Sequence, residues 1–300
     1  MTRTIGRDVT GLKVQMSGPV LVPGDEGYDA ARSVWNGDID RYPAVVARCT
    51  GPDDVAAALR YAQEVGLEVA VRGGGHGYWG AAVPEGGLMV DLSPIHHVVV
   101  DAAARRARVG GGATLGELDA ATQAHGLAVP AGTVSHTGIG GLTLGGGFGW
   151  FSRLHGFTID NLESAEVVLA DGRCVRASAT EHPDLFWALR GGGGNFGVVT
   201  EFEFRLHELG PIVQFALLAV EQDRAAHAVR AARDVVDRSA ISTVRLIGGA
   251  LADDAVLDTQ QFVRPTYEDG ELVLVTRPAA GGRLVPFEQP RQRACCSDHG

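Results

Sequence analysis

The sequence predicts an α+β fold, and three observations support this expectation. Residues 44–71 have the pattern of a strand, a helix and a second strand, whereas residues 88–109 and 159–206 contain mostly short strands. In addition, the 42 glycines among 300 residues are well above the roughly 7% of an average protein, and they gather in a few loops. This clustering favours ligand-binding loops over low-complexity sequence.

The first strand-helix-strand unit leads directly into a glycine loop. Residues 44–49 (AVVARC) are expected to form a short buried strand. Thr50 is expected to cap a helix over Pro52–Val65, and Gly66 is expected to end it. The apolar strand Leu67–Val71 then completes a βαβ-like unit.

Further elements follow in the order three strands, helix, hairpin, helix and strand. Short strands are expected at Leu88–Leu92, Val98–Val100 and Arg106–Val109, and helices at Thr114–His125 and Asp184–Arg190. The strand-rich stretch Ile159–Leu169 turns at Asp171-Gly172 into a strand at Cys174–Ala177, because an Asp-Gly pair between two β-prone runs signals a hairpin. Val198–Leu206 alternates apolar and polar residues, as a half-buried strand does.

The character of the sequence changes near Gly210, where a second domain is expected to begin. A strand is expected at Ile212–Val220 and an amphipathic helix at Asp223–Ser239, after which the patterning decays. The expected organisation is a lead-in that is irregular or weakly helical (1–17), a first domain (18–208), a partial second domain (209–262) and an irregular tail (263–300).

Composition excludes several classes of protein. The formal net charge is −10 and no basic patch is visible, so no nucleic-acid partner is expected. The four cysteines lack a CxxC spacing, which argues against a zinc site or a disulfide framework. The N-terminus has no apolar signal region, and no run of about 18 apolar residues occurs. No membrane partner is therefore expected, and the expected location is cytoplasmic.

The segment Arg72-Gly73-Gly74-Gly75-His76-Gly77 carries the most chemistry. Glycine has no Cβ, so its loop can bring bare backbone N–H groups against an anion, and this loop also places one imidazole beside the bound group. Together with clusters at 138–149 and 191–197, it predicts a large phosphate-bearing cofactor. Residues 192–197 fit G-x-G-x-x-G, but they follow a helix and precede a strand, so a Rossmann dinucleotide fold is rejected.

Four motifs in a fixed order carry a family resemblance. They are RGGGH (72–76), PAGTVSHTGIGGLTLGGGFGW (130–150), DN (160–161) and RGGGGNFGVVT (190–200), preceded by an entry segment that contains residues 19–25 and 28–36. In these motifs residues 18–208 resemble the FAD-linked oxidases of the vanillyl-alcohol oxidase or PCMH superfamily, in the berberine-bridge-enzyme-like branch. The resemblance implies a PCMH-type FAD-binding domain of two subdomains, followed by a truncated α/β substrate domain.

The resemblance also implies the role of each loop toward FAD. His76 matches the histidine whose ring is bonded to the 8α-methyl carbon of the flavin, and a neutral imidazole is a competent nucleophile near pH 7. Many members carry a second link from a cysteine to flavin C6, but Val134 stands at that position and valine forms no such bond. A single covalent link is therefore expected. His136 either faces the flavin or has a structural or phosphate-side role.

The remaining candidate ligands of FAD are mostly glycines. For the cluster at 138–147 two interpretations stay open, tight packing between strands and backbone approach to the pyrophosphate and ribityl chain, of which the second is favoured. Val199 is a core residue in the alternative interpretation, and Arg190 is expected to be an ion-pair partner. The full set of expected cofactor-binding residues is Arg72, Gly73, Gly74, Gly75, His76, Gly77, Gly132, Thr133, Thr137, Gly138, Gly141, Gly145, Asn161, Val198 and Val199.

The function expected from the resemblance is that of an FAD-dependent oxidoreductase. A small organic substrate would transfer a hydride to the flavin, and O2 would reoxidise it. No catalytic base, substrate identity or oligomeric state follows from the sequence. Because family members are longer, two alternatives stay open: a non-catalytic or fragmentary flavin-binding remnant, and a subunit whose partner chain supplies the missing cover.

Overall fold

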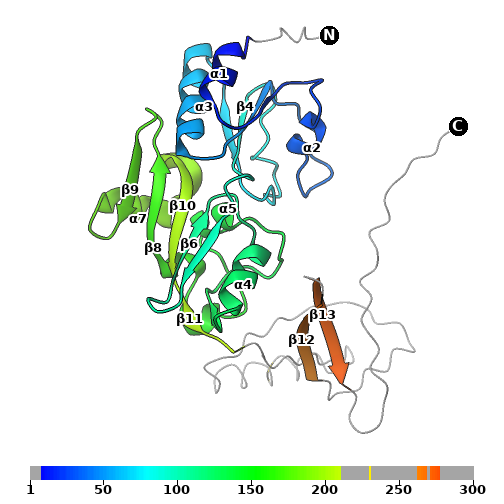
Figure 1. Ribbon diagram of the computed structural model, residues 1–300, viewed down its shortest axis with the longest axis vertical. Helices are drawn as coiled ribbons and strands as arrows, with labels where there is room; N and C mark the ends of the chain where they lie inside the picture. The colour runs from blue at the N-terminus through cyan, green and yellow to red at the C-terminus, as the bar shows by residue number, and fades with distance from the viewer. Residues whose placement is uncertain (1–7, 211–229, 231–261, 269–270, 278–300) are drawn as a thin grey trace, which may run out of the picture. The chain divides into compact units, whose positions relative to one another are not determined.

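The computed structural model describes residues 8–210, residue 230, residues 262–268 and residues 271–277 (Figure 1). The chain divides into two compact units, with the boundary after Leu209. Within the described ranges, no helix is long and apolar enough to cross a membrane. The first unit contains two subdomains, and the candidate site lies on loops from both.

The first subdomain is built on a four-stranded sheet in the order β1-β2-β4-β3. Strands β2, β4 and β3 are parallel, and β1 pairs with β2 in the antiparallel direction. The expected βαβ-like unit is present, with β4 inserted between its two strands. Its elements are α1 (Thr10–Gln15), β1 (Val20–Leu21), α2 (Tyr28–Arg32), β2 (Val45–Arg48), α3 (Pro52–Val65), β3 (Val69–Arg72) and β4 (Leu88–Asp91).

Helix α3 has the bounds that the sequence predicts, but it begins differently. Gly51, not Thr50, is the N-cap residue, and no side chain caps the helix. The backbone N–H and the hydroxyl of Thr50 instead donate to the Asp54 carboxylate at 2.9 and 2.7 Å, so the predicted Thr50 cap is wrong. Gly66 ends the helix at φ +67, where a residue without Cβ is favoured.

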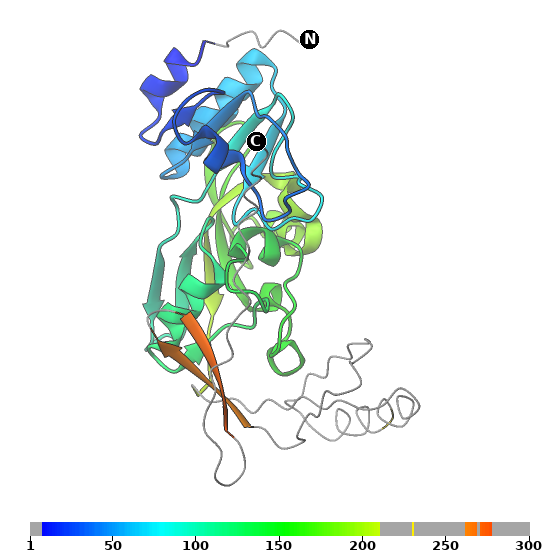
Figure 2. The same cartoon turned by 90° about the vertical axis from the view of Figure 1, so that its right-hand side faces the viewer.

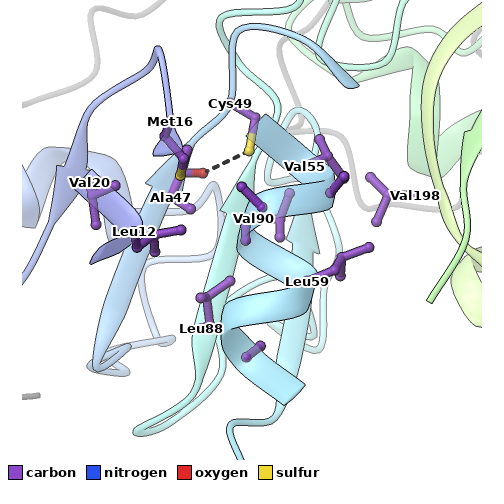
Figure 3. Close-up of a cluster of buried hydrophobic side chains, with 14 of the residues drawn as sticks. Leu12, Met16, Val20, Ala47, Cys49, Val55, Leu59, Leu88, Val90 and Val198 are labelled. Atoms are coloured by element: carbon purple, nitrogen blue, oxygen red, sulfur yellow. Dashed lines mark hydrogen bonds between the residues drawn. The ribbon is translucent and has the colours of Figure 1, made fainter. Parts of the chain in front are cut away.

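The core of this subdomain lies between α3 and the sheet, as Figure 3 shows. Val55 and Leu59 of α3 pack with Leu88 and Val90 of β4 because helix spacing places both α3 residues on the face toward the sheet. Val198 of the second subdomain joins the same cluster. The two subdomains therefore share buried apolar surface.

The second subdomain contains a five-stranded antiparallel sheet in the order β5-β6-β10-β8-β9. Its strands are β5 (Val98–Asp101), β6 (Arg106–Gly110), β8 (Leu162–Val168), β9 (Cys174–Ser178) and β10 (Val198–Arg205). Two short strands, β7 (Leu127–Ala128) and β11 (His207–Glu208), form a separate two-stranded sheet. The helical elements are α4 (Leu115–Gln123), α5 (Ile139–Leu144), α6 (Ser152–His155), η1 (Thr158–Asn161), α7 (Pro183–Gly192) and η2 (Gly193–Phe196).

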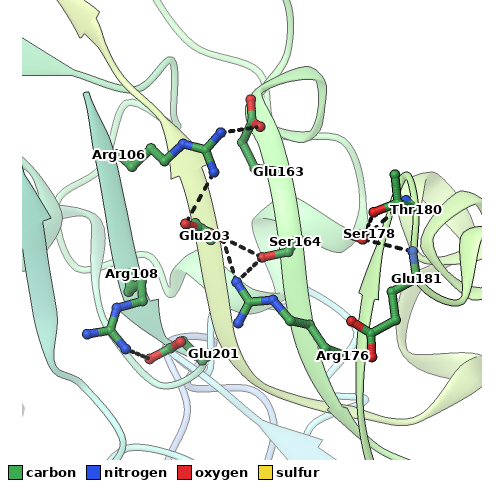
Figure 4. A network of polar contacts seen from close by, with 10 residues as sticks. All are labelled: Arg106, Arg108, Glu163, Ser164, Arg176, Ser178, Thr180, Glu181, Glu201 and Glu203. Atoms are coloured by element: carbon green, nitrogen blue, oxygen red, sulfur yellow. Dashed lines mark hydrogen bonds and ion pairs between the residues drawn. The ribbon is translucent and has the colours of Figure 1, made fainter. Parts of the chain in front are cut away.

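Strand β10 shows why the predicted alternation gives a sheet with two different faces. Phe202 and Phe204 are buried, in one cluster with residues of α4, α5 and α7. Glu201 and Glu203 point to the opposite face, where Arg176 and Arg106 contact Glu203 at 2.6 and 3.4 Å (Figure 4). One face of the sheet therefore packs into the core. The other face carries ion pairs near the surface, which contribute little to stability.

Two expectations for this region are partly corrected. The predicted hairpin is confirmed, with Gly172 at φ +82 between β8 and β9, but residues 158–161 form a 3₁₀ turn where strand had been expected from Ile159. Helix α7 and η2 precede β10, so residues 192–197 lie in a helix-to-strand connection. The rejection of a Rossmann loop there is confirmed.

The second unit contains one described hairpin, β12 (Phe262–Glu268) paired with β13 (Glu271–Arg277). The expectation that residues 263–300 form an irregular tail is wrong for these two strands. The apolar run Leu272-Val273-Leu274-Val275 has high β-propensity, and the sequence between the strands is Asp269-Gly270, the hairpin signal already used at residues 171–172. The strand expected at 212–220 and the helix expected at 223–239 lie, apart from residue 230, outside the described residues.

Candidate functional site

The glycine-histidine loop begins at the last residue of β3 and packs against the start of α5. A Cβ added at Gly74 would lie 2.2 Å from the backbone nitrogen of Gly138, and a Cβ at Gly138 would lie 2.2 Å from that of Gly74. Only glycine permits this approach of two backbones. Gly75 adopts φ +66 and is buried, so the chain turns sharply there before His76.

Arg72 ties this loop to the C-terminal end of α2. Its guanidinium donates to the carbonyl oxygens of Ala31 and Ser33 at 2.9 and 3.1 Å, and lies 3.6 Å from the Asp91 carboxylate. Asp91 is fully buried and also accepts a bond from Arg48. The contacts of Arg72 are thus those of a structural anchor, while its Nε is buried with no hydrogen-bond partner.

The imidazole of His76 lies between two other rings. Its Nε2 is 2.6 Å from Nδ1 of His136, and its face stacks on the indole of Trp35 with a centroid separation of 5.0 Å. Burial, followed by the proximity of His136, lowers the pKa of His76 from its ordinary value. His76 is therefore a neutral imidazole at pH 7, the protonation state that a nitrogen nucleophile requires.

The expected ligand residues of the 132–145 loop divide by what surrounds them. Gly132 packs against Leu142 and Leu115, where a Cβ would clash at 2.6 and 2.9 Å, whereas Gly141 has open space around its Cβ position. Thr133 is exposed. The backbone of Thr137 accepts a bond from Leu115 at 2.9 Å, and Gly145 ends α5.

Packing explains part of the glycine cluster. Gly138, Gly140 and Gly147 each meet other atoms within 3 Å of an added Cβ, so close packing accounts for them, although between loops and helical turns and not between strands as expected. Nothing lies within 4 Å at Gly141 or Gly146. Their approach to a pyrophosphate stays a prediction.

Three expected residues are not joined to the glycine loops by any described side-chain hydrogen bond. Asn161 is buried, donates to the carbonyl oxygens of His155 and Phe157 at 2.9 Å each, and accepts a 2.6 Å contact from His207. Asn161 thus organises its own neighbourhood. Val198 and Val199 are both buried, one in the core of each subdomain.

Sequence reasoning missed three features of the site. Trp35 was noticed only as part of the entry segment, and no signal linked it to His76, 41 positions later. His136 was singled out without a partner, although the structure gives it one. Asp91 lacked any motif; its position at the end of a buried strand was the available signal.

These loops suit a large phosphate-bearing cofactor with a planar ring system. Two glycine backbones meet at Gly74 and Gly138, open space remains at Gly77 and Gly141, and a neutral imidazole follows directly. Residues 73–77 and the three glycines Gly138, Gly140 and Gly141 would hold the cofactor phosphates through backbone N–H groups. Among the described residues, no group of three or more His, Cys, Asp or Glu side chains suits a metal ion.

Comparisons with known proteins point the same way. Residues 43–178 match the model of the FAD binding domain family. The chain is 42% identical over 200 residues to (R)-6-hydroxynicotine oxidase of Paenarthrobacter nicotinovorans, covering 67% of this chain and 43% of that protein. It is 39% identical over 206 residues to glucooligosaccharide oxidase of Sarocladium strictum, covering 67% of this chain and 41% of the relative.

Solved structures are similar over the same part of the chain. 6-Hydroxy-D-nicotine oxidase from Arthrobacter nicotinovorans matches with a TM-score of 0.70 at 38% identity, over 74% of this chain and 49% of that one. Glucooligosaccharide oxidase from Acremonium strictum, described with a 6-S-cysteinyl, 8α-N1-histidyl FAD, matches with a TM-score of 0.70 at 33% identity, over 76% and 49%. The chain spans less than half the length of these relatives.

Proposed function

We propose that this chain carries FAD tethered through His76 and oxidises a small organic substrate. The chain belongs to the FAD-linked oxidases of the berberine-bridge-enzyme-like branch and contains their PCMH-type FAD-binding domain. The observation that carries this proposal is the His76 imidazole itself. It directly follows the glycine turn, it is held by rings on two sides, and burial lowers its pKa, which favours the neutral form.

The residues of this chain bind and orient, while the cofactor provides the redox chemistry. Bound FAD would accept a hydride from the substrate and pass two electrons to dioxygen. Backbone N–H groups of residues 73–77 and of Gly138, Gly140 and Gly141 would supply positive potential for the phosphates, which suits a chain of net charge −10 with no basic patch. The N–H groups of Thr137 and Ile139 already donate to Val134 and Ala113. Val134 offers no thiol, so His76 would be the single tether.

The substrate class follows only in outline from the relatives. Two of the similar proteins are named for a hydroxynicotine and for glucooligosaccharides, so an amine and a sugar hydroxyl are the substrates to test first. No residue among the described ranges is assigned as the catalytic base.

The test is to purify the full chain, precipitate it with acid and measure flavin fluorescence in the denatured band. We expect about one flavin per chain in the unaltered protein and none in His76→Ala. Flavin that is fully released on denaturation would refute the tether, and an adduct that survives in His76→Ala would move it elsewhere.

Catalysis needs a separate measurement. The flavin absorbance is followed anaerobically after addition of 6-hydroxynicotine, glucooligosaccharides and simple alcohols. Bleaching with one of them, reversed by air, is the expected result. If the protein carries covalent flavin but none of these substrates bleaches it, the protein binds flavin without turning over any of them.

A further inference from the structure

The contact between His76 and His136 determines which nitrogen of His76 is free. At 2.6 Å, Nε2 of His76 and Nδ1 of His136 share one hydrogen. If His136 donates it, Nδ1 of His76 carries the other proton and has no lone pair for a new bond. If His76 donates it, Nδ1 of His76 is unprotonated and nucleophilic.

The surroundings of both rings are fixed by backbone contacts. The carbonyl oxygens of Ser135 and Thr137, on either side of His136, accept bonds from Gly116 and Leu115 at 2.8 and 2.9 Å. His136 is therefore presented by a segment anchored to the first turn of α4, a turn that is itself closed by a capping box.

Trp35 is fixed to the other side of His76. Its backbone N–H donates to the carbonyl oxygen of Gly75 at 3.1 Å, which places the indole beside the next residue, His76. The indole and imidazole planes differ by 18°. One face of the imidazole is thus covered, its Nε2 edge is occupied by His136, and a flip of the ring would break the contact with His136.

We propose that Trp35 and His136 are positioning residues for covalent attachment of the flavin. His136 holds the proton of His76 on Nε2, so that Nδ1 is the attacking atom, and His136 accepts that proton when the bond forms. This inference rests on the proposed function, because it assumes that His76 is the tether.

The reaction balances with dioxygen as the oxidant. The Nδ1–C bond replaces one C–H bond of the flavin 8α-methyl group and the N–H bond of His76. The proton on Nε2 of His76 passes to Nδ1 of His136. His136 is an exposed residue, so it can in turn release the proton on its own Nε2 to solvent. The two electrons leave through the flavin to dioxygen and, with two protons, give hydrogen peroxide.

The first test needs no flavin. In ¹⁵N spectra of the apoprotein at pH 7.5, His76 should be protonated on Nε2, and His136→Ala should give a mixture of the two tautomers. His136→Asn should restore the Nε2–H form, because the asparagine amide oxygen reaches nearly the position of Nδ1 and accepts a hydrogen bond. A His76 ring protonated on Nδ1 in the unaltered protein would overturn the proposal.

The second test follows attachment in time. Apoprotein from riboflavin-limited cells is mixed with FAD, and covalent flavin is measured in denatured samples, alongside the noncovalent affinity for FAD. We expect attachment to slow about a hundredfold in His136→Ala, the size of a lost proton acceptor, with affinity nearly unchanged. His136→Asn should be slow as well, since an amide orients the ring but takes no proton.

Trp35 is tested in the same assay. Trp35→Ala should slow attachment severalfold and Trp35→Phe should restore it, because phenylalanine keeps a stacking face. His125→Asn and Trp187→Phe, at exposed positions of the same residue types, serve as controls and should match the unaltered rate. Unchanged rates in both His136 variants would overturn the inference, whereas absence of any adduct in the unaltered, folded protein would overturn the tether itself.

Discussion

Two histidine pairs lie in the FAD-binding part of the molecule, and they are built in opposite ways. His76 and His136 meet edge to edge through two ring nitrogens 2.6 Å apart. His155 and His207 stack face to face, with centroids 3.8 Å apart and planes 15° apart, and His207 contacts Asn161 at 2.6 Å. The pKa of each of His76, His155 and His207 is lowered, mainly by burial.

The difference lies in what each pair leaves available. In the first pair Nδ1 of His76 has no described partner, and the loops around it include glycines with open space. In the second pair the described contacts go to Asn161, which itself holds two backbone carbonyls, so the cluster joins α6, η1 and β11. A lowered histidine pKa therefore does not distinguish a reactive site from a structural one; the neighbours do.

The largest effect is expected from a methyl group placed where the two glycine loops meet. In Gly138→Ala the new Cβ would lie 2.2 Å from the nitrogen and 2.6 Å from the Cα of Gly74, and backbone atoms cannot give way cheaply. We expect a loss of about 3 kcal/mol in the free energy of unfolding, typical of severe overpacking, and loss of covalent flavin. Urea unfolding and fluorescence of the denatured protein measure the two.

Gly141→Ala is the matched control for that substitution. Gly141 lies in α5, the helix that follows the N-cap residue Gly138, and nothing lies within 4 Å of its added Cβ, so the stability of this variant should stay equal or rise by up to about 1 kcal/mol. Equal destabilisation by both substitutions would mean that the approach of Gly74 to Gly138 is not what requires glycine.

Removing the centre of the second pair should have a smaller effect. Asn161→Ala leaves the carbonyl oxygens of His155 and Phe157 without donors and His207 Nε2 without its partner, which should cost about 2–3 kcal/mol in unfolding free energy. Asn195→Ala, which loses one exposed bond to Gly192, should cost under about 1 kcal/mol. If Asn161→Ala also abolished attachment of flavin while remaining folded, the structural assignment of this pair would be wrong.

The sequence predicted elements better than contacts, and the reason is physical. Alternation located β10 because burial of one face is encoded in every second residue of a strand, and Gly66 located the end of α3 because a residue without Cβ is favoured where a helix stops. The glycine loop after β3 was recognisable because close backbone approach excludes every other residue. The partner of His76 was not predictable, since Trp35 and His136 come from segments 41 positions before and 60 positions after it. Asn161 was assigned to the cofactor by resemblance, but its described bonds are local.

The pH dependence of stability should separate the second pair further. Burial, followed by His155 and Arg205, lowers the pKa of His207 from 6.5 to about 4. Between these values the unfolded chain binds more protons than the folded one, so the contribution of His207 is complete above about pH 6.5 and is lost as pH falls toward 4. Because the ring is half-exposed, we expect a loss on the order of 1–2 kcal/mol.

Urea unfolding at pH 4.5 and 7.5 measures this loss, with His207→Gln as the comparison. The variant keeps every other titrating group. The difference between the two proteins in the unfolding free energy lost from pH 7.5 to pH 4.5 therefore belongs to His207. Identical pH dependence in both proteins would show that His207 titrates alike in the folded and unfolded chains.

The smallest effect on stability, and the sharpest on chemistry, is expected from Val134→Cys. Val134 is 41% exposed and lies two residues before His136, so the substitution should change stability by less than about 0.5 kcal/mol. If the 132–137 loop runs along the flavin, the new thiol should form a second link, and His76→Ala/Val134→Cys should retain the covalent flavin that His76→Ala lacks. Leu154→Cys places a thiol of similar exposure beside the other pair, at 40%, and should give no adduct. Peptide mass spectrometry identifies the linked residue. An adduct at position 154, or none at position 134, would contradict the assignment of the flavin to the first pair's loops.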